Sequence, residues 1–125
     1  MKILVVDDER DIKILFEQRF RREIHSSKIE FAFAYGGEEA LRYLELHDHE
    51  VVLILSDINM PGMSGLELLR LIKQKYKSPP QIVMMITAYG DADNYKLAFQ
   101  LGADEFLTKP LDFMLLKEKL QTLMS

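Results

Sequence analysis

Short apolar segments recur along the chain, and most of them stop at a polar residue. Continuous apolar runs occupy 3–6, 51–55 and 82–86, and such runs are typical of strands buried on both faces of a sheet. At 29–34, large apolar residues instead alternate with glutamate and alanine, which predicts a strand with one better-buried face, at or near the edge of the sheet. A brief fifth strand is predicted at 105–107.

The segments between these strands carry apolar residues at helical spacing. In the first of them, Ile12, Phe16 and Phe20 follow one another at intervals of one helical turn. The same spacing recurs after each later strand. Five helices are predicted in this way: one over about 10–22, one around 40–44, one that begins near Leu66 after the capping residue Ser64, one over 92–101, and one that follows Pro110.

The regular alternation of strands and helices indicates the fold class. Parallel strands need a helical crossover between them, and right-handed crossovers place helices on both faces of the sheet. We therefore expect an α/β protein with a five-stranded parallel sheet. At 125 residues the chain has the length of one ordinary domain, so a single domain over 1–125 is predicted.

Polar residues stand where the predicted strands end. Asp7 and Asp8 follow the first strand, Asp57 the third, Thr87 the fourth and Lys109 the fifth. The carboxyl ends of parallel strands share one edge of the sheet, which is where ligands bind in doubly wound folds. Two like charges about 5 Å apart repel by about 3 kcal/mol at an effective dielectric constant of roughly 20. Three carboxylates therefore favour a bound cation such as Mg²⁺, whereas a solvated acidic edge is the alternative.

Composition and charge narrow the class of protein further. The chain has 16 basic and 20 acidic residues, a net charge of -4, and no basic run, which argues against direct binding to nucleic acid. It has no cysteine, which excludes disulfides, thiolate metal sites and thiol nucleophiles. The amino-terminal apolar run is too short for a signal peptide or a membrane span. We therefore expect a cytoplasmic protein that does not bind membranes.

Four short motifs together resemble the receiver domain of bacterial two-component response regulators. They are LVVDDE at 4–9, SDINMPGMSG at 56–65, ITA at 86–88 and FLTKP at 106–110. The resemblance covers the whole chain and implies a flavodoxin-like, doubly wound (βα)₅ sandwich with strand order 2-1-3-4-5. It also implies a receiver domain with no output domain in these residues, and favours a cis peptide bond between Lys109 and Pro110.

By this resemblance, the acidic residues form a phosphorylation site. Asp57 is the phosphoacceptor, which attacks the phosphorus of a phosphohistidine on a sensor kinase or phosphotransfer protein. The implied ligands of Mg²⁺ or Mn²⁺ are Asp8, Asp57, the backbone carbonyl of Asn59 and, through water, Asp7. Lys109 would bridge a phosphoryl oxygen and the acidic cluster. The implied protein is a signalling switch, and its only catalysis is its own phosphoryl transfer and autodephosphorylation.

The resemblance also implies a conformational readout. The Thr87 hydroxyl donates to a phosphoryl oxygen, and the ring of Phe106, where many receivers carry tyrosine, fills the space that the moving loop vacates. The readout face consists of the helix over 92–101, the strand over 105–107 and the last helix. There, Tyr95 and Phe99 lie one helical turn apart and off the apolar stripe of their helix. They form either an exposed patch for a downstream output domain or protein, or for a homodimer, or an ordinary pair of partly buried rings.

Two further side chains have an implied role in the lifetime of the phosphate. Asn59 and Tyr89 occupy positions that, in the family, border the path of the hydrolytic water. In contrast, the histidines of the HDHE stretch, His47 and His49, have no third ligand at suitable spacing, so a solvated loop is expected there.

Two other function classes compete with the receiver interpretation. Phosphatases and phosphotransferases that use an aspartate nucleophile generally place a second aspartate two residues later, where this chain has Asn59. A flavodoxin-like cofactor binder needs a glycine-rich or hydroxyl-rich phosphate loop after the first strand, where Asp7 and Asp8 would repel phosphate. Within the receiver interpretation, the chain is either a stand-alone protein or the amino-terminal module of a larger regulator.

Overall fold

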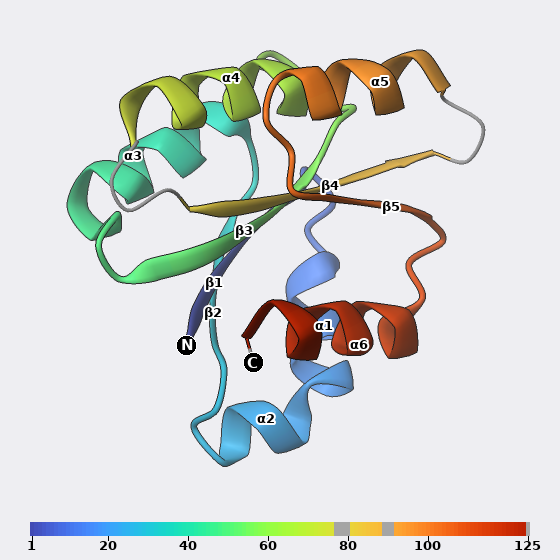
Figure 1. Ribbon diagram of the computed structural model, residues 1–125. Helices are drawn as coiled ribbons and strands as arrows, with labels where there is room; N and C mark the ends of the chain where they lie inside the picture. Colours follow the sequence, from blue (N-terminus) through green and yellow to red (C-terminus); the bar gives the residue numbers. More distant parts are fainter. Residues whose placement is uncertain (77–80, 89–91, 125) are drawn as a thin grey trace.

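One five-stranded sheet lies between two layers of helices (Figure 1). The structure, a computed structural model, describes residues 1–76, 81–88 and 92–124. None of the helices in the described part of the chain is long and apolar enough to cross a membrane. The strands are β1 (Lys2–Val6), β2 (Glu30–Ala34), β3 (Val51–Asp57), β4 (Ile82–Ala88) and β5 (Glu105–Lys109), and the helices are α1 (Ile12–Arg19), α2 (Arg21–His25), α3 (Gly37–His47), α4 (Gly65–Lys75), α5 (Ala92–Gln100) and α6 (Phe113–Met124).

The sheet has the predicted topology. Its order is β2-β1-β3-β4-β5, and every neighbouring pair is parallel. The predicted edge position of β2 is therefore confirmed. Because β1 and β3 are neighbours, the residues at their carboxyl ends lie side by side.

Alternate residues of the strands supply two separate hydrophobic cores. Leu4 and Val6 of β1 face the cluster that is covered by α3, α4 and α5. Ile3 and Val5 of the same strand face the cluster that is covered by α1 and α6. Burial on both faces explains why the central strands are continuously apolar.

The first predicted helix is wrong as a single element over 10–22. α1 starts at Ile12, and the backbone leaves the helical region at Phe20 (φ -110°, ψ 25°), so that α2 forms a separate short helix. Phe20 is completely buried and its ring contacts those of Phe16 and Phe31, at centroid distances of 5.7 and 5.1 Å. The helix ends where Phe20 packs against β2. The spacing of apolar residues along the chain does not predict this contact.

The sequence predicts that the run at 51–55 is buried along its whole length, but one of its residues is exposed. Lys2 pairs with Val51 and Ile3 pairs with Leu53, so the register of β1 and β3 shifts by one residue. Val52 is the extra residue at this irregularity, and it is 45% exposed. At the other end of the sheet the strands extend beyond the apolar runs, because Thr87 pairs with Thr108 and Ala88 with Lys109.

Candidate functional site

The loop that follows β3 holds Asp57 in a fixed position. Ile58 N–H donates to Ile86 O at 3.0 Å, and Gly65 N–H donates to Ile58 O at 2.8 Å. A Cβ atom on Gly65 would lie 2.0 Å from Asp57 O, so only glycine allows this close approach of α4 to the strand. The predicted cap of α4 is confirmed, since Ser64 Oγ accepts a hydrogen bond from Glu67 N–H at 3.2 Å.

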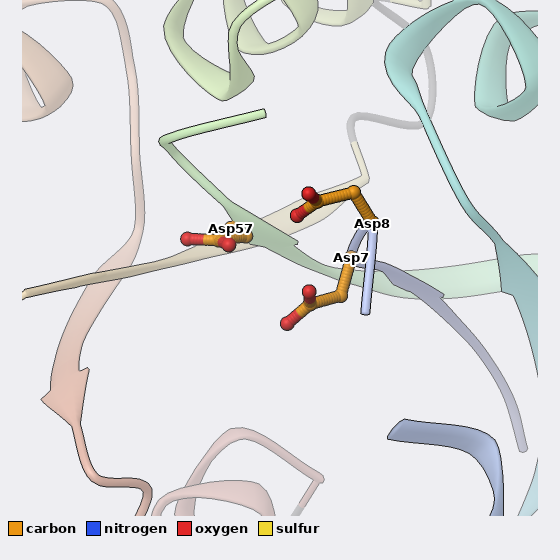
Figure 2. A group of neighbouring side chains, drawn as sticks. All are labelled: Asp7, Asp8 and Asp57. Carbon is orange, nitrogen blue, oxygen red and sulfur yellow. The ribbon is translucent and has the colours of Figure 1, made fainter. Parts of the chain in front are cut away.

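Three carboxylates converge at the carboxyl ends of β1 and β3 (Figure 2). One carboxylate oxygen from each of Asp7, Asp8 and Asp57 lies within 4.8 Å of the others. Asp7 and Asp57 are only 3% and 5% exposed, whereas Asp8 is partly exposed. The convergence predicted from the strand ends is therefore present in the structure, and two of its members are largely removed from water.

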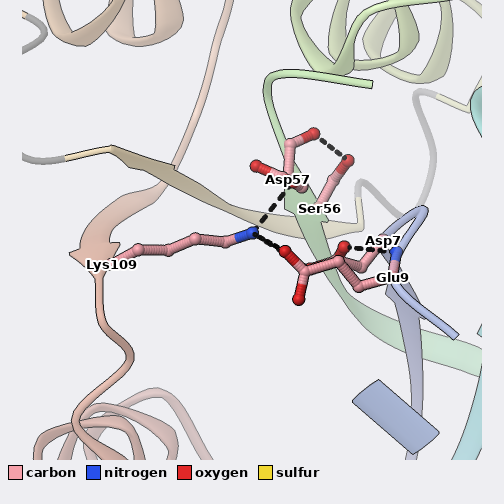
Figure 3. A network of polar contacts seen from close by, with 5 residues as sticks. All are labelled: Asp7, Glu9, Ser56, Asp57 and Lys109. Atoms are coloured by element: carbon pink, nitrogen blue, oxygen red, sulfur yellow. Dashed lines mark hydrogen bonds and ion pairs between the residues drawn. The ribbon is translucent and has the colours of Figure 1, made fainter. Parts of the chain in front are cut away.

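Lys109 points into this cluster from the end of β5 (Figure 3). Its Nζ donates to Asp57 Oδ2 at 3.0 Å and to Asp7 Oδ2 at 3.4 Å, and lies 3.9 Å from Glu9 Oε1. The peptide bond between Lys109 and Pro110 is cis, as the resemblance favoured. Among the described residues, one ammonium group thus contacts three carboxylates, with Asp8 as a fourth beside them, and the site keeps an excess of negative charge.

Burial and charge act against each other on the ionisable groups of the site. Burial raises the pKa of the Asp57 carboxyl above its usual range, and the hydrogen bond from Lys109 only partly offsets this effect. Burial would lower the pKa of Lys109, but its hydrogen bond to Asp57 and the nearby carboxylate charges outweigh burial and raise it. Lys109 therefore stays protonated and available to neutralise an anion.

The donor set fits a hard divalent cation. The converging ligand atoms are all carboxylate oxygens, which suit Mg²⁺ or Mn²⁺ better than softer metals. The backbone N–H of Asn59 is also close enough to the Asp57 carboxylate to lower the pKa of that group. The residues present thus fit the metal that the sequence predicts.

Thr87 lies at the same edge of the sheet and has an unused hydroxyl group. It is 1% exposed, and its Oγ1 has no hydrogen-bond partner in the described part of the chain. Leaving a buried polar atom without a partner costs free energy. Thr87 Oγ1 is therefore available to bind an additional acceptor at this site.

Phe106 contacts the two aromatic residues that were singled out on the helix over 92–101. Its ring centroid lies 4.8 Å from that of Tyr95 and 6.3 Å from that of Phe99. Tyr95 is 50% exposed and Phe99 40% exposed. The three rings form one cluster, which we call the aromatic cluster, at the junction of α5 and β5. Tyr89 lies outside the described residues.

Glu9 is a neighbour of Lys109 that the sequence did not predict, and His47, which was expected in a solvated loop, is the last residue of α3. Glu9 is exposed but close to the ammonium group, and its position directly after two aspartates was the available signal. His47 pairs with Glu50, with 2.7 Å between Nδ1 and Oε2, and His49 is exposed. Within the described residues, the only group of three potential ligands is the acidic cluster.

Comparison with known proteins gives one consistent family. The family described as "Response regulator receiver domain" matches residues 3–121. The chain is 39% identical to the response regulator protein PilR of Pseudomonas aeruginosa over 97% of its length, and 34% identical to the transcriptional regulatory protein CpxR of Escherichia coli over 89% of its length. It spans only 25% of PilR and 44% of CpxR.

Solved structures agree with this match. A response regulator receiver domain protein from Clostridium thermocellum superposes with a TM-score of 0.84 at 31% identity, over 97% of this chain and 91% of that one. A response regulator receiver protein from Pseudomonas putida gives a TM-score of 0.82 at 27% identity, over 97% and 95% of the two chains. The predicted fold and the resemblance are therefore both confirmed.

Proposed function

Because the chain belongs to the response regulator receiver domain family, we propose that Asp57 accepts a phosphoryl group from a phosphohistidine of a sensor kinase or phosphotransfer protein. The observation that carries this proposal is the pairing of a buried Asp57 carboxylate with Lys109 at 3.0 Å, beside two further aspartates. Phosphoryl transfer needs neutralised charge and aligned reactants more than it needs covalent help from the protein.

The transfer exchanges one bond to phosphorus for another. An Asp57 carboxylate oxygen forms the new bond to phosphorus, while the bond to the imidazole nitrogen breaks and its electron pair stays on that nitrogen. The product is an aspartyl phosphate. Lys109 Nζ, which donates to the Asp57 carboxylate beforehand, shifts to donate to a phosphoryl oxygen and stabilises the charge there.

The acidic residues serve the reaction by holding a divalent cation. Asp8, Asp57 and the Asn59 carbonyl would hold the cation, and Asp7 would act on it through water. When bound, Mg²⁺ or Mn²⁺ neutralises the phosphoryl oxygens and lowers the barrier to attack by an anion. Asp7 also accepts the N–H of Glu9 at 3.0 Å, which fixes its side chain. The side chains of Asn59 and Tyr89 modulate access of water to the phosphate.

Phosphorylation is read out through Thr87. Its hydroxyl, which has no partner among the described residues, donates to a phosphoryl oxygen, which draws the end of β4 toward the site. Phe106 then changes its packing against Tyr95 and Phe99, because all three rings are in contact. The face made by α5, β5 and α6 thereby controls a downstream output domain or protein, or a homodimer. We place this signalling in the cytoplasm, without direct contact with nucleic acid.

Phosphorylation by acetyl phosphate, followed by intact mass, tests the proposed role of Asp57. We expect the mass of one phosphoryl group in the presence of Mg²⁺ and almost none when EDTA replaces it. Asp57→Ala should lose the adduct, whereas Asp48→Ala, an aspartate at the opposite end of the sheet, should keep it. An adduct that persists in Asp57→Ala would contradict the assignment.

A further inference from the structure

β2 forms the edge of the sheet opposite β5 (Figure 1). Its free edge borders a groove. The groove has a volume of about 670 Å³. β2 forms its floor with Phe31 and Phe33, Lys13 and Glu17 of α1 line one side, and Ile24 of α2 also contributes. An unpaired strand edge beside an open groove can accept another strand.

The register with β1 determines which backbone groups of β2 point into the groove. Glu30 N–H donates to Met1 O at 2.8 Å, and Ala34 O accepts from Asp7 N–H at 3.1 Å. Glu30, Ala32 and Ala34 therefore direct their backbone groups toward β1, in the parallel register. Phe31 and Phe33 consequently direct their N–H and C=O groups outward, and we call these two the outward residues.

The backbone N–H groups just before and just after the outward residues already have acceptors within the same chain. Before the outward residues, Ile29 N–H donates to Glu23 O at 3.2 Å. After them, Tyr35 N–H donates to Glu39 Oε2 at 3.2 Å. Free donors thus remain only on the two outward residues of this edge, which restricts the registers that an added strand can adopt.

Between its two closed ends, the edge lacks three common devices that block pairing. Edge strands are commonly blocked by lysine, proline or a bulge. β2 reads EFAFA, with neither lysine nor proline, and its register with β1 is uninterrupted. The two phenylalanines are only partly buried. This strand is therefore suited to pairing.

We propose that β2 pairs antiparallel with β2 of a second copy of this chain, with Phe31 of each copy opposite Phe33 of the other. In an antiparallel pair, opposite residues of the hydrogen-bonded type exchange both of their backbone bonds. The four free groups of each edge are then all used. Ala32 lies on the two-fold axis, opposite Ala32 of the second copy, as a pair without hydrogen bonds.

Charge complementarity identifies a second copy as the occupant. Lys13 and Glu17 are one turn apart on α1, both are exposed, and neither forms an ion pair within the described residues. The two-fold axis of this pair is perpendicular to the sheet. The two α1 helices therefore lie on the same side of the joined sheet and are antiparallel. Lys13 of each copy then faces Glu17 of the other, so the contact is self-complementary, as an isologous interface requires.

This interface is separate from the proposed readout face. β2 and β5 lie at opposite edges of the sheet, so pairing through β2 leaves the acidic cluster and the aromatic cluster uncovered. The proposal therefore does not depend on phosphorylation of Asp57.

A single cysteine at the two-fold axis tests the register. In a pair without hydrogen bonds the two Cα atoms are about 4.5 Å apart, which is within the range that a disulfide spans. The chain has no cysteine, so Ala32→Cys can crosslink only through that position. We expect disulfide-linked dimers after mild oxidation, and none from Gln74→Cys, an exposed position on α4. Equal crosslinking of the two variants, or a free thiol in Ala32→Cys, would overturn the proposal.

Charge reversal tests the contact without altering β2. Lys13→Glu or Glu17→Lys alone turns two attractive pairs into repulsive ones and should weaken the dimer about tenfold in sedimentation equilibrium. The double variant Lys13→Glu/Glu17→Lys restores complementarity and should restore the dimer. If both single variants associate as the unaltered protein does, or if the double variant is as weak as either single one, the proposed pairing is wrong.

Discussion

Charged side chains gather at both ends of the sheet, but in opposite ways. At the carboxyl end, buried Asp7 and Asp57 share one ammonium group, and negative charge remains in excess. At the amino end, Lys2 pairs with Glu30 and Glu50 at 3.7 and 3.5 Å in a largely exposed setting. Exposed pairs are screened by water and contribute little. A functional site is therefore recognised by buried charge that the protein leaves unbalanced.

The side chains of the amino-end cluster contact one another, although Glu30 and Glu50 also outnumber its one ammonium group. His47 approaches Glu50 to 2.7 Å and stacks on Tyr43, with 4.5 Å between ring centroids. Its hydrogen bonds are thus satisfied within the cluster. At the carboxyl end, in contrast, Thr87 Oγ1 is without a partner in the described part of the chain. Incomplete hydrogen bonding prepares this end for a ligand.

Replacing the lysine of each cluster should give the largest difference between the carboxyl and amino ends of the sheet, measured as the rate of phosphorylation. Lys109→Met should slow phosphorylation by acetyl phosphate about 10²–10³-fold, the usual cost of losing one preorganised donor to a developing anion. Lys2→Met, the matched change at the amino end, should leave the rate unchanged. Initial rates from intact mass provide the measurement. Equal rates for the two variants would remove the distinction between the clusters.

Gly65 should be essential for stability, because it packs against the backbone of Asp57. Gly65→Ala should destabilise the fold by about 3 kcal/mol or more, because its Cβ would meet backbone atoms, which cannot move aside as a flexible side chain can. Gly36→Ala is the matched control, since nothing lies within 4 Å of the added atom. Urea unfolding of both variants measures the difference. A Gly65→Ala protein as stable as Gly36→Ala would contradict the described geometry.

Divalent metal should stabilise the carboxyl end. Mg²⁺ at a hundred times its dissociation constant should add about 2.7 kcal/mol to the free energy of unfolding. Asp8→Asn should remove most of this gain, whereas His47→Gln should retain it, because the amino-end cluster is not the metal site. Thermal unfolding with Mg²⁺ and with EDTA distinguishes these outcomes. The same gain in Asp8→Asn would exclude Asp8 as a ligand.

Thr87→Val should have the smallest effect on stability. Its buried hydroxyl has no partner in the described residues, so the isosteric change should leave the free energy of unfolding unchanged or raise it by up to about 1 kcal/mol. The same variant should still be phosphorylated but should lose the response at Phe106. A marked loss of stability would show that the hydroxyl is already used before phosphorylation.

Strand ends and short motifs were enough to predict most of the site. The positions of Asp7, Asp57 and Lys109 follow from where the apolar runs stop, because parallel strands bring their carboxyl ends to one edge. The break at Phe20 and the exposure of Val52 could not be predicted, since they depend on aromatic packing and on the register of two strands that are distant in sequence. Local patterns carry no information about such long-range contacts.

The contacts of individual side chains were equally beyond the sequence. The approach of Glu9 to Lys109 depends on the path of the loop after β1. The packing of Phe106 against Tyr95 depends on how α5 crosses β5. The residue types at these positions restrict the chemistry, but only the folded chain determines which groups meet.

We propose that Asp57 and the carboxylates beside it form one phosphate-responsive metal site. Beryllofluoride binding, followed by amide NMR shifts, tests it most directly, because the complex mimics the aspartyl phosphate. We predict that beryllofluoride and Mg²⁺ together shift the amides of Thr87 and Phe106, that neither does so alone, and that Asp57→Ala abolishes the response. Shifts of the same size without Mg²⁺, or in Asp57→Ala, would contradict the claim.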